Sequence, residues 1–211
     1  MILSTSFGQK TIHYVALGDS YTIGTGAGPG ESWPSVATAR LQKKGIPVEL
    51  TANLGHNGWT AQNVIDGELP YLKQLNPDFV TLLIGTNDWV QGVDAQTFQK
   101  NVEYILSQLL QTLPANHILL ITVPDFSVTP SGAEYSNGRN ISEGLKEFNQ
   151  ILFQEAQTHN LKIVDIFPLS QSLGKDLSNI SPDGLHPSAK GYASWADLIT
   201  PALESACTGN S

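Results

Sequence analysis

Residues 11–20 read TIHYVALGDS, an apolar run with large and β-branched side chains that ends on glycine, aspartate and serine. Such a run predicts a short buried strand over residues 11–17, followed by a tight turn. Similar short runs rich in Val, Ile and Leu predict further strands over residues 48–53, 78–84, 117–123 and 162–167. The fold class then depends on what lies between these runs.

The segments between the predicted strands have the period of amphipathic helices. The clearest follows Asp94, the predicted N-cap, with apolar side chains at steps of three and four residues. These side chains are Phe98, Val102, Ile105, Leu109 and Leu113. The other predicted helices cover residues 32–44, 60–75, 141–159 and 188–206, and Gly67 and Pro70 interrupt the one over 60–75.

Five strands alternating with five helices predict an α/β fold in which helices cover both faces of a parallel sheet. The chain has 211 residues, of which 40% are hydrophobic, so it can bury one sizeable core. No long linker or internal repeat divides it. We therefore expect a single domain over residues 1–211, with its core at about 11–206 and a short flexible C-terminal tail.

Charge and cysteine content exclude several function classes. Nineteen acidic residues against eleven basic ones give a formal charge of −8, which makes nucleic acid and anionic membrane surfaces poor partners. Cys207 is the only cysteine, which excludes an intrachain disulfide and a cysteine-based metal site, and we expect no metal and no cofactor. Oligomeric state cannot be predicted from the sequence.

Membrane and export signals are also missing from the sequence. No apolar run approaches the ~18 residues that a transmembrane helix needs, so we expect no integral membrane association. The N-terminal residues do not have the pattern of a signal peptide. A cytoplasmic location is therefore the default expectation, with a secreted mature form left open.

Polar loops follow the predicted strands. In a parallel sheet the carboxyl ends of the strands meet at one edge, where ligands bind. Three strands lead into GDS at 18–20, GHNGW at 55–59 and GTNDW at 85–89, and DGLHP at 183–187 lies beyond the fifth. Folding is expected to bring these four loops together at that edge.

These loops contain the groups that acyl-ester hydrolysis requires. Ser20 lies in a tight turn after a strand, so its hydroxyl is a candidate nucleophile that projects into the crevice. His186 lies three residues after Asp183, so the carboxylate can hold one ring nitrogen and leave the other free as a base. The backbone N–H groups of Ser20 and Gly55 and the side-chain amide of Asn87 are candidate oxyanion donors.

Each of these motifs alone is ordinary. A turn serine and a loop histidine beside an N-capping aspartate are common in proteins of any function. By chance, however, the motifs would occur together in only about one chain in 10⁴ to 10⁵. The combination favours an active site.

With these four blocks the sequence resembles the GDSL-type hydrolases, also called the SGNH hydrolase superfamily, from Val15 to about Trp195. The resemblance rests on GDSYTIG at 18–24, NLGHNG at 53–58, GTND at 85–88 and DGLHP at 183–187. It implies a flavodoxin-like three-layer α/β/α sandwich with a five-stranded parallel sheet. It also implies a serine esterase or lipase that works through an acyl-enzyme.

Carried over residue by residue, the resemblance makes Ser20 the nucleophile, His186 the base and Asp183 the group that orients it. Gly55 and Asn87 then complete the oxyanion hole with the Ser20 amide. Turnover is expected to rise with pH as the imidazole loses its proton. Tyr21 stands where the family name has Leu, which puts the packing at that position in question more than the activity.

Several further residues have two interpretations. Asp165 is the alternative orienting carboxylate. His56 has Asn53 rather than an aspartate three residues before it, so it is predicted to line the substrate pocket or to form a hydrogen bond. Trp59 and Trp89 form either an apolar wall for the acyl group or part of the buried core.

Two long loops are predicted to form the rim of the crevice. The glycine-rich residues 24–30 do not have the spacing of a nucleotide-binding motif, and residues 124–139 form the second rim. The sequence thus predicts an esterase acting on a small-molecule acyl ester, with lysophospholipase or thioesterase activity included. A carbohydrate O-acetylesterase is the alternative enzyme, and a non-catalytic carbohydrate- or lipid-binding module is the alternative of another class.

Overall fold

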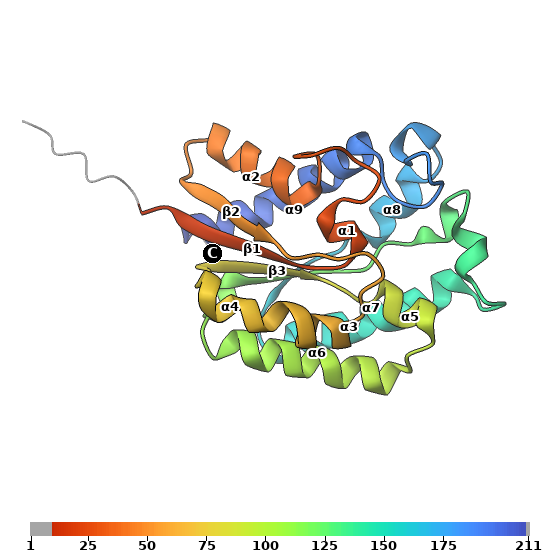
Figure 1. Cartoon of the computed structure of the whole chain (residues 1–211), viewed down its shortest axis with the longest axis horizontal. Coiled ribbons are helices and arrows are strands. Elements are labelled where there is room, and N and C mark those ends of the chain that lie inside the picture. Colours follow the sequence, from red (N-terminus) through yellow and green to blue (C-terminus); the bar gives the residue numbers. More distant parts are fainter. Residues whose placement is uncertain (1–9, 210–211) are drawn as a thin grey trace, which may run out of the picture.

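Five parallel strands form one sheet in the computed structural model, which describes residues 10–209. Their order is β2-β1-β3-β4-β5, as in flavodoxin-like folds, which confirms the predicted architecture (Figure 1). The strands are β1 (Ile12–Gly18), β2 (Val48–Asn53), β3 (Phe79–Leu83), β4 (Ile118–Ile121) and β5 (Lys162–Val164). The strand order reverses between β1 and β3, so the ligand crevice is expected beyond their carboxyl ends.

Helices cover both faces of the sheet (Figure 1). One layer consists of α1 (Ser20–Ile23), α2 (Trp33–Lys43), α8 (Phe167–Leu173) and α9 (Ala189–Thr208). The other consists of α3 (Ala61–Asn63), α4 (Leu69–Leu75), α5 (Thr86–Gln91), α6 (Ala95–Leu110) and α7 (Ile141–Thr158). A π-helical turn, η1 (Val64–Glu68), joins α3 to α4. The short 3₁₀ turns are η2 (Ala115–His117), η3 (Phe126–Val128), η4 (Gly132–Tyr135) and η5 (Leu177–Asn179).

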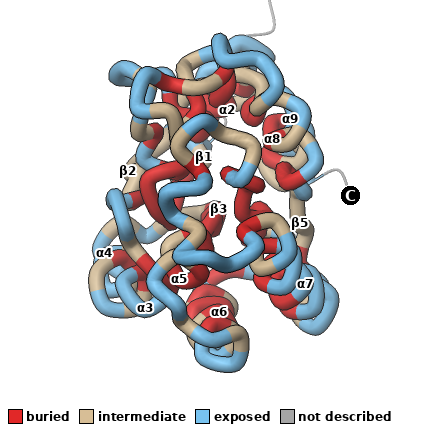
Figure 2. Tube along the Cα trace, turned by 90° about the vertical axis from the view of Figure 1, so that its right-hand side faces the viewer, coloured by how far each residue is buried: buried red, intermediate tan, exposed pale blue. Residues whose placement is uncertain are grey.

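The alternating side chains of β1 divide the apolar core into two clusters. Tyr14 and Ala16 pack with the α2 and α9 layer, where Trp33 and Trp195 are buried. Val15 and Leu17 pack with the layer of α6 and α7. Figure 2, which looks onto the carboxyl ends of the strands, shows these buried strands enclosed by more exposed helices and loops. Burial on both faces explains why β1, β3 and β4 have nearly continuous apolar sequences, whereas the partly exposed β2 and β5 do not.

The predicted helix boundaries hold in part. Asp94 caps α6 by accepting from the Thr97 N–H at 2.9 Å, as predicted. The predicted 60–75 helix contains the π turn η1 instead of a break, and Pro70 lies in the first turn of α4. The strand predicted over 162–167 ends at Val164.

The last helix extends beyond the predicted start of the C-terminal tail. Helix α9 runs to Thr208, so Cys207 is a half-buried helical residue and does not lie in a tail. Residues 210–211 lie outside the described part of the chain. Within residues 10–209, each helix is too short or too polar to cross a membrane.

Candidate active site

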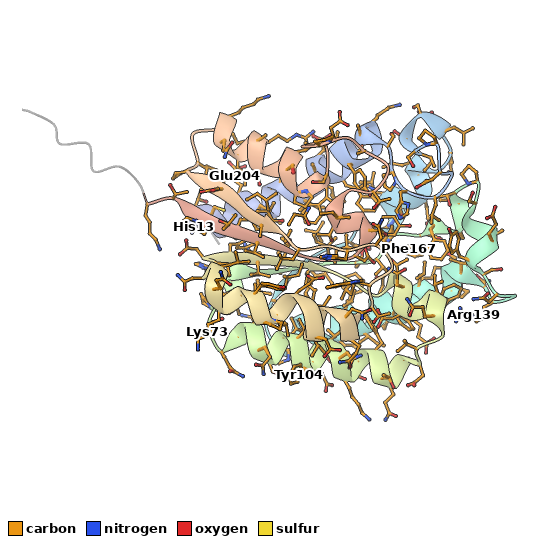
Figure 3. The ribbon with its side chains drawn as sticks, in the orientation of Figure 1. His13, Lys73, Tyr104, Arg139, Phe167 and Glu204 are labelled. Atoms are coloured by element: carbon orange, nitrogen blue, oxygen red, sulfur yellow. The ribbon has the colours of Figure 1, made fainter. Side chains whose placement is uncertain are left out.

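Three chain segments meet beyond the carboxyl ends of β1 and β3. Ser20 begins α1 directly after β1, Asn87 lies in the first turn of α5 after β3, and His186 lies in the loop that leads into α9. The rim residue Arg139 lies at this end of the molecule, whereas His13 lies at the opposite end (Figure 3). The predicted convergence of the loops is therefore present in the structure.

Ser20, His186 and Asp183 form a hydrogen-bonded chain. The Ser20 Oγ lies 2.9 Å from His186 Nε2, and His186 Nδ1 lies 2.7 Å from Asp183 Oδ2. An ionised carboxylate only accepts hydrogen bonds, so Nδ1 carries the proton and Nε2 is left to accept from the serine hydroxyl. The serine is 6% exposed and the histidine side chain 14% exposed. This arrangement can remove a proton from Ser20.

Asp183 is held by more than its contact with the imidazole. Its Oδ1 accepts from the Ser181 hydroxyl at 2.7 Å and from the N–H groups of Leu185 at 2.8 Å and His186 at 2.9 Å. Burial raises the pKa of Asp183, but these hydrogen bonds outweigh it and hold the pKa at about 2. The carboxylate is thus ionised and fixed in orientation at neutral pH.

The turn that presents Ser20 depends on glycine. Gly18 has φ of 151°, and a Cβ at this position would collide with the carbonyl oxygen of Leu83 and the hydroxyl of Thr22. Asp19 caps α1 by accepting from the Tyr21 N–H at 2.9 Å. The backbone is therefore packed tightly against β3, and the Ser20 side chain is directed by a turn that has little freedom to move.

Two of the candidate oxyanion donors lie near this turn and already have partners. The Gly55 N–H donates to Asn53 Oδ1 at 3.2 Å, and a Cβ on Gly55 would lie 2.6 Å from the carbonyl oxygen of Asp19. Asn87 Nδ2 donates to the carbonyl of Trp59 at 3.0 Å and lies 3.4 Å from Asp19 Oδ2. The Ser20 N–H opens α1, so it has no partner within the helix.

A cavity of about 200 Å³ adjoins Ser20 and His186. Its polar lining includes Asn57 and Asn87, and its apolar lining comes from side chains to which sequence reasoning gave no individual role in substrate binding. These side chains are Tyr21, Val90, Phe126, Tyr135 and Leu185. Most belong to loops and short turns with no helical or strand period, which explains why the sequence alone did not reveal them.

His56 and Trp59 lie beside the cavity and not in its lining. Their rings stack with centroids 4.1 Å apart, and both line an adjoining open hollow of about 900 Å³ with the glycine-rich residues 24–30. His56 Nδ1 lies 2.8 Å from the carbonyl oxygen of Leu54. The hollow and the Ser20 cavity both include Asn57.

Trp89 does not form an acyl wall. It is 5% exposed, packs against Phe126 and the Cα of Gly144, and has the Arg139 guanidinium 4.0 Å from its ring. The neighbouring Val90 lines the cavity instead. Successive residues on a helix point about 100° apart, so only one of the two side chains faces the substrate side. Trp89 is therefore a core residue, one of the two interpretations that the sequence left open.

Asp165 is not the orienting carboxylate. It accepts from the Thr122 hydroxyl at 2.9 Å and from the Phe167 N–H at 3.0 Å, which ties β4 to the start of α8. Tyr21, noted as a departure from the family pattern, packs on the His186 ring with centroids 5.1 Å apart. The tyrosine thus supports the imidazole, a role that the motif did not predict.

Two aspartates of the motifs are fully buried. Asp88 accepts from the Ala61 N–H with both oxygens, at 3.1 and 2.9 Å, and so connects α5 to α3. Burial raises the pKa of Asp88 to about 6, and burial together with the nearby Asp88 raises that of Asp19 to about 8. Within residues 10–209, no His, Cys, Asp and Glu side chains are grouped in a way that could hold a metal ion.

Comparison with known proteins agrees with this geometry. Residues 16–194 match the model of the GDSL-like Lipase/Acylhydrolase family. The chain is 27% identical over 169 residues to a multidomain esterase of Ruminococcus flavefaciens and 24% identical over 198 residues to an acetylxylan esterase of Xylanibacter ruminicola. These alignments cover 71% and 77% of this chain but only 21% and 39% of those longer proteins.

The fold is also that of a solved structure, the lipase/acylhydrolase from Enterococcus faecalis. The TM-score is 0.75 and the identity 22%, and the match covers 92% of this chain and 96% of the other. At this identity the likeness supports the fold alone.

Proposed function

Because the chain belongs to the GDSL-like lipase/acylhydrolase family, we propose that it is a carboxylic ester hydrolase, that Ser20 is its nucleophile and that it works through an acyl-enzyme. The observation that carries this proposal is the hydrogen-bonded chain from Ser20 through His186 to Asp183, at 2.9 and 2.7 Å. A nucleophile, a base and a group that orients the base are thus in contact before substrate binds.

The reaction begins with proton transfer from the Ser20 hydroxyl to His186 Nε2 as Oγ attacks the ester carbonyl carbon. The imidazolium that forms is stabilised by the ionised Asp183 at Nδ1. His186 then gives the proton to the leaving alcohol oxygen, and the acyl group remains on Ser20. A water molecule, activated by the same imidazole, releases the acid and restores the serine.

The negative charge on the carbonyl oxygen is proposed to meet three donors. The Ser20 N–H has no partner within α1, and the second amide hydrogen of Asn87 makes only the long 3.4 Å contact with Asp19. Gly55 donates its N–H at 3.2 Å to Asn53 and would share it with the oxyanion. Preorganised donors of this kind cost no reorganisation at the moment of reaction.

The acyl group is proposed to enter the cavity of about 200 Å³, where Val90, Phe126, Tyr135 and Leu185 supply apolar contacts. The substrate is then a small-molecule ester, and a lysophospholipid or a thioester is included in this class. A long acyl chain would have to extend beyond this volume into solvent or along the rim.

Carbohydrate O-acetyl esters are the second candidate substrate. The similarity to the acetylxylan esterase of Xylanibacter ruminicola supports it, as does the open hollow of about 900 Å³ that adjoins the cavity at Asn57. An acetyl group would need only a small part of the cavity, and the hollow would accept a bulky polar alcohol.

Hydrolysis of p-nitrophenyl esters from acetyl to long chain tests both proposals, with Ser20→Ala compared to the native protein. We expect Ser20→Ala to lose about 10³-fold or more in kcat. Ser107→Ala is the matched control, because that exposed serine donates to the Tyr104 carbonyl on α6, away from the site. Activity confined to acetyl esters supports the carbohydrate esterase, and activity that rises with chain length supports the lipid or thioester class.

A Ser20→Ala variant that keeps full activity would contradict the assignment of the nucleophile. Labelling by a fluorophosphonate probe provides a second readout that needs no knowledge of the substrate. If neither turnover nor labelling occurs, the chain is instead a non-catalytic binding module on this fold.

A further inference from the structure

Glu68 is a buried acid that the proposed mechanism does not use. It ends the π turn η1, between α3 and α4 on the lower face of the sheet (Figure 1). The residue is 1% exposed, and its Oε2 accepts from the Gly18 N–H at 2.9 Å. Within residues 10–209, its other oxygen, Oε1, has no hydrogen-bond partner although it is fully buried. A buried carboxyl with an unpaired oxygen is costly and calls for an explanation.

Glu68 is connected to the candidate active site through the backbone of Gly18. Gly18 ends β1, two residues before Ser20, and its carbonyl accepts from the His56 N–H at 3.3 Å. One residue before His56 is Gly55, the proposed oxyanion donor. Glu68 thus contacts the backbone of one residue, Gly18, that is bonded both to the turn with the nucleophile and to the loop with an oxyanion donor.

The surroundings of Glu68 favour its neutral form. Burial raises the pKa of Glu68 to about 9, and the nearby Asp19 contributes to this shift. Asp88 in turn raises the pKa of Asp19. The other charged groups on the elements packed around η1 are exposed to solvent: Asp66 on η1, Lys73 on α4, and Lys100 and Glu103 on α6. His13 on β1 is half-buried and hydrogen-bonds to Thr51. An ionised Glu68 would therefore face a second carboxyl, and among the described residues no cation pairs with it.

We propose that Glu68 is a positioning residue, whose neutral carboxylic acid holds the Gly18–Asp19–Ser20 turn in its reactive conformation and whose ionisation limits Ser20 reactivity at alkaline pH. The proton is lost to solvent, and the resulting carboxylate repels Asp19, because both side chains are buried and bulk solvent screens their charges poorly. The turn then shifts away from His186 and Gly55. This inference rests on the proposed role of Ser20 as nucleophile.

The rate of fluorophosphonate labelling of Ser20, measured from about pH 6 to about pH 10, tests this inference in the intact protein. In the native protein we expect the labelling rate to fall about tenfold per pH unit above the pH at which Glu68 ionises. Glu68→Gln keeps the acceptor for Gly18 but cannot ionise, so it should keep the neutral rate within about threefold and lose the alkaline fall. Glu68→Ala should label about tenfold or more slowly at neutral pH.

Glu155→Gln is the matched control, because Glu155 is buried on α7 and accepts from Gln99 outside the site. It should keep the alkaline fall of the native protein. A Glu68→Gln variant that keeps this fall overturns the inference. So does a Glu68→Ala variant that labels at the native rate.

The Gly18 amide resonance provides a readout that needs neither variant nor activity. If Ser20 is not labelled at any pH, the proposed function fails, and the inference on Glu68 is decided by NMR of the native protein. A Gly18 N–H signal that titrates in the alkaline range supports the neutral Glu68 contact. A signal that does not shift between neutral and alkaline pH overturns it.

Discussion

Asp183→Asn should abolish turnover almost completely although it keeps the shape of the side chain. The reason lies in the three donors around Asp183 Oδ1: the Ser181 hydroxyl and the backbone N–H groups of Leu185 and His186. In the variant, the asparagine oxygen must stay at this position to accept from them. Its NH₂ group then takes the place of Oδ2, 2.7 Å from His186 Nδ1.

The cost of the opposite orientation sets the size of this effect. The two backbone N–H groups cannot turn, so an inverted amide would lose at least two hydrogen bonds, about 2 kcal/mol or more. The inverted form is thus a minor population, and the NH₂ group donates to Nδ1. The imidazole proton is then forced onto Nε2, which can no longer accept the Ser20 proton. A wrong tautomer of this kind costs about 10⁴-fold in kcat, or about 5.4 kcal/mol of transition-state stabilisation.

The measurement is kcat on p-nitrophenyl acetate for the native protein, Asp183→Asn and Asp183→Ala. Alanine has no N–H that faces the imidazole, so Asp183→Asn should be no more active than Asp183→Ala despite its closer shape. Asp176→Asn is the control, because this exposed aspartate also has a pKa of about 2 and accepts from Ser178 and Lys190, with no hydrogen bond to His186 among those of the described residues. Asp183→Asn activity within tenfold of the native protein, or above that of Asp183→Ala, would refute the reasoning.

Two further variants test the oxyanion donors and the buried acids. Asn87→Ala removes a proposed donor and should lower kcat about 10² to 10³-fold with little change in KM, so a KM effect without a kcat effect would contradict the role. Asp88→Asn tests pH-dependent stability: burial raises the pKa of Asp88 to about 6, so its favourable contribution, present below its unfolded value of 3.8, is lost as pH rises through about 6. The Tm of the native protein should therefore fall relative to Asp88→Asn over this range, and parallel Tm curves would exclude the shift.

Much of the fold was predictable because strand and helix periods are local properties of the sequence. The five strands appear at the predicted runs with ends shifted by up to three residues, and the apolar stripe behind Asp94 forms α6 as far as Leu110. The sheet order follows from short parallel crossovers. The contacts of Ser20 with His186 were predictable for a related reason. The topology brings the strand ends, and with them Ser20 and His186, to one edge of the sheet. The three-residue spacing then places the Asp183 carboxylate beside the His186 ring.

The pocket was less predictable because it depends on how elements are rotated and packed. Whether Trp89 or Val90 faces the cavity is decided by the rotation of α5 against α7, which no local pattern encodes. Glu68 did leave a signal: it lies four residues after Val64 and four before Leu72, in the apolar stripe of its segment. An acid at an apolar position predicts a buried carboxyl, but its partner Gly18 is fifty residues away in sequence.

The charge states of the carboxyl groups in the site match the charges that would form during the reaction. Asp183 has a pKa of about 2 and lies beside the imidazole, where positive charge develops, so its ionised form stabilises the transition state. Asp19 lies beside the proposed donor Asn87, and Glu68 contacts the Gly18 N–H two residues before Ser20. A negative charge there would oppose the reaction, and burial raises the pKa values of Asp19 and Glu68 to about 8 and about 9. Hydrogen bonding to one acid and burial of the other two thus produce opposite charge states within one site. For this reason, a substitution that admits water to Glu68 should impair Ser20 without touching the substrate.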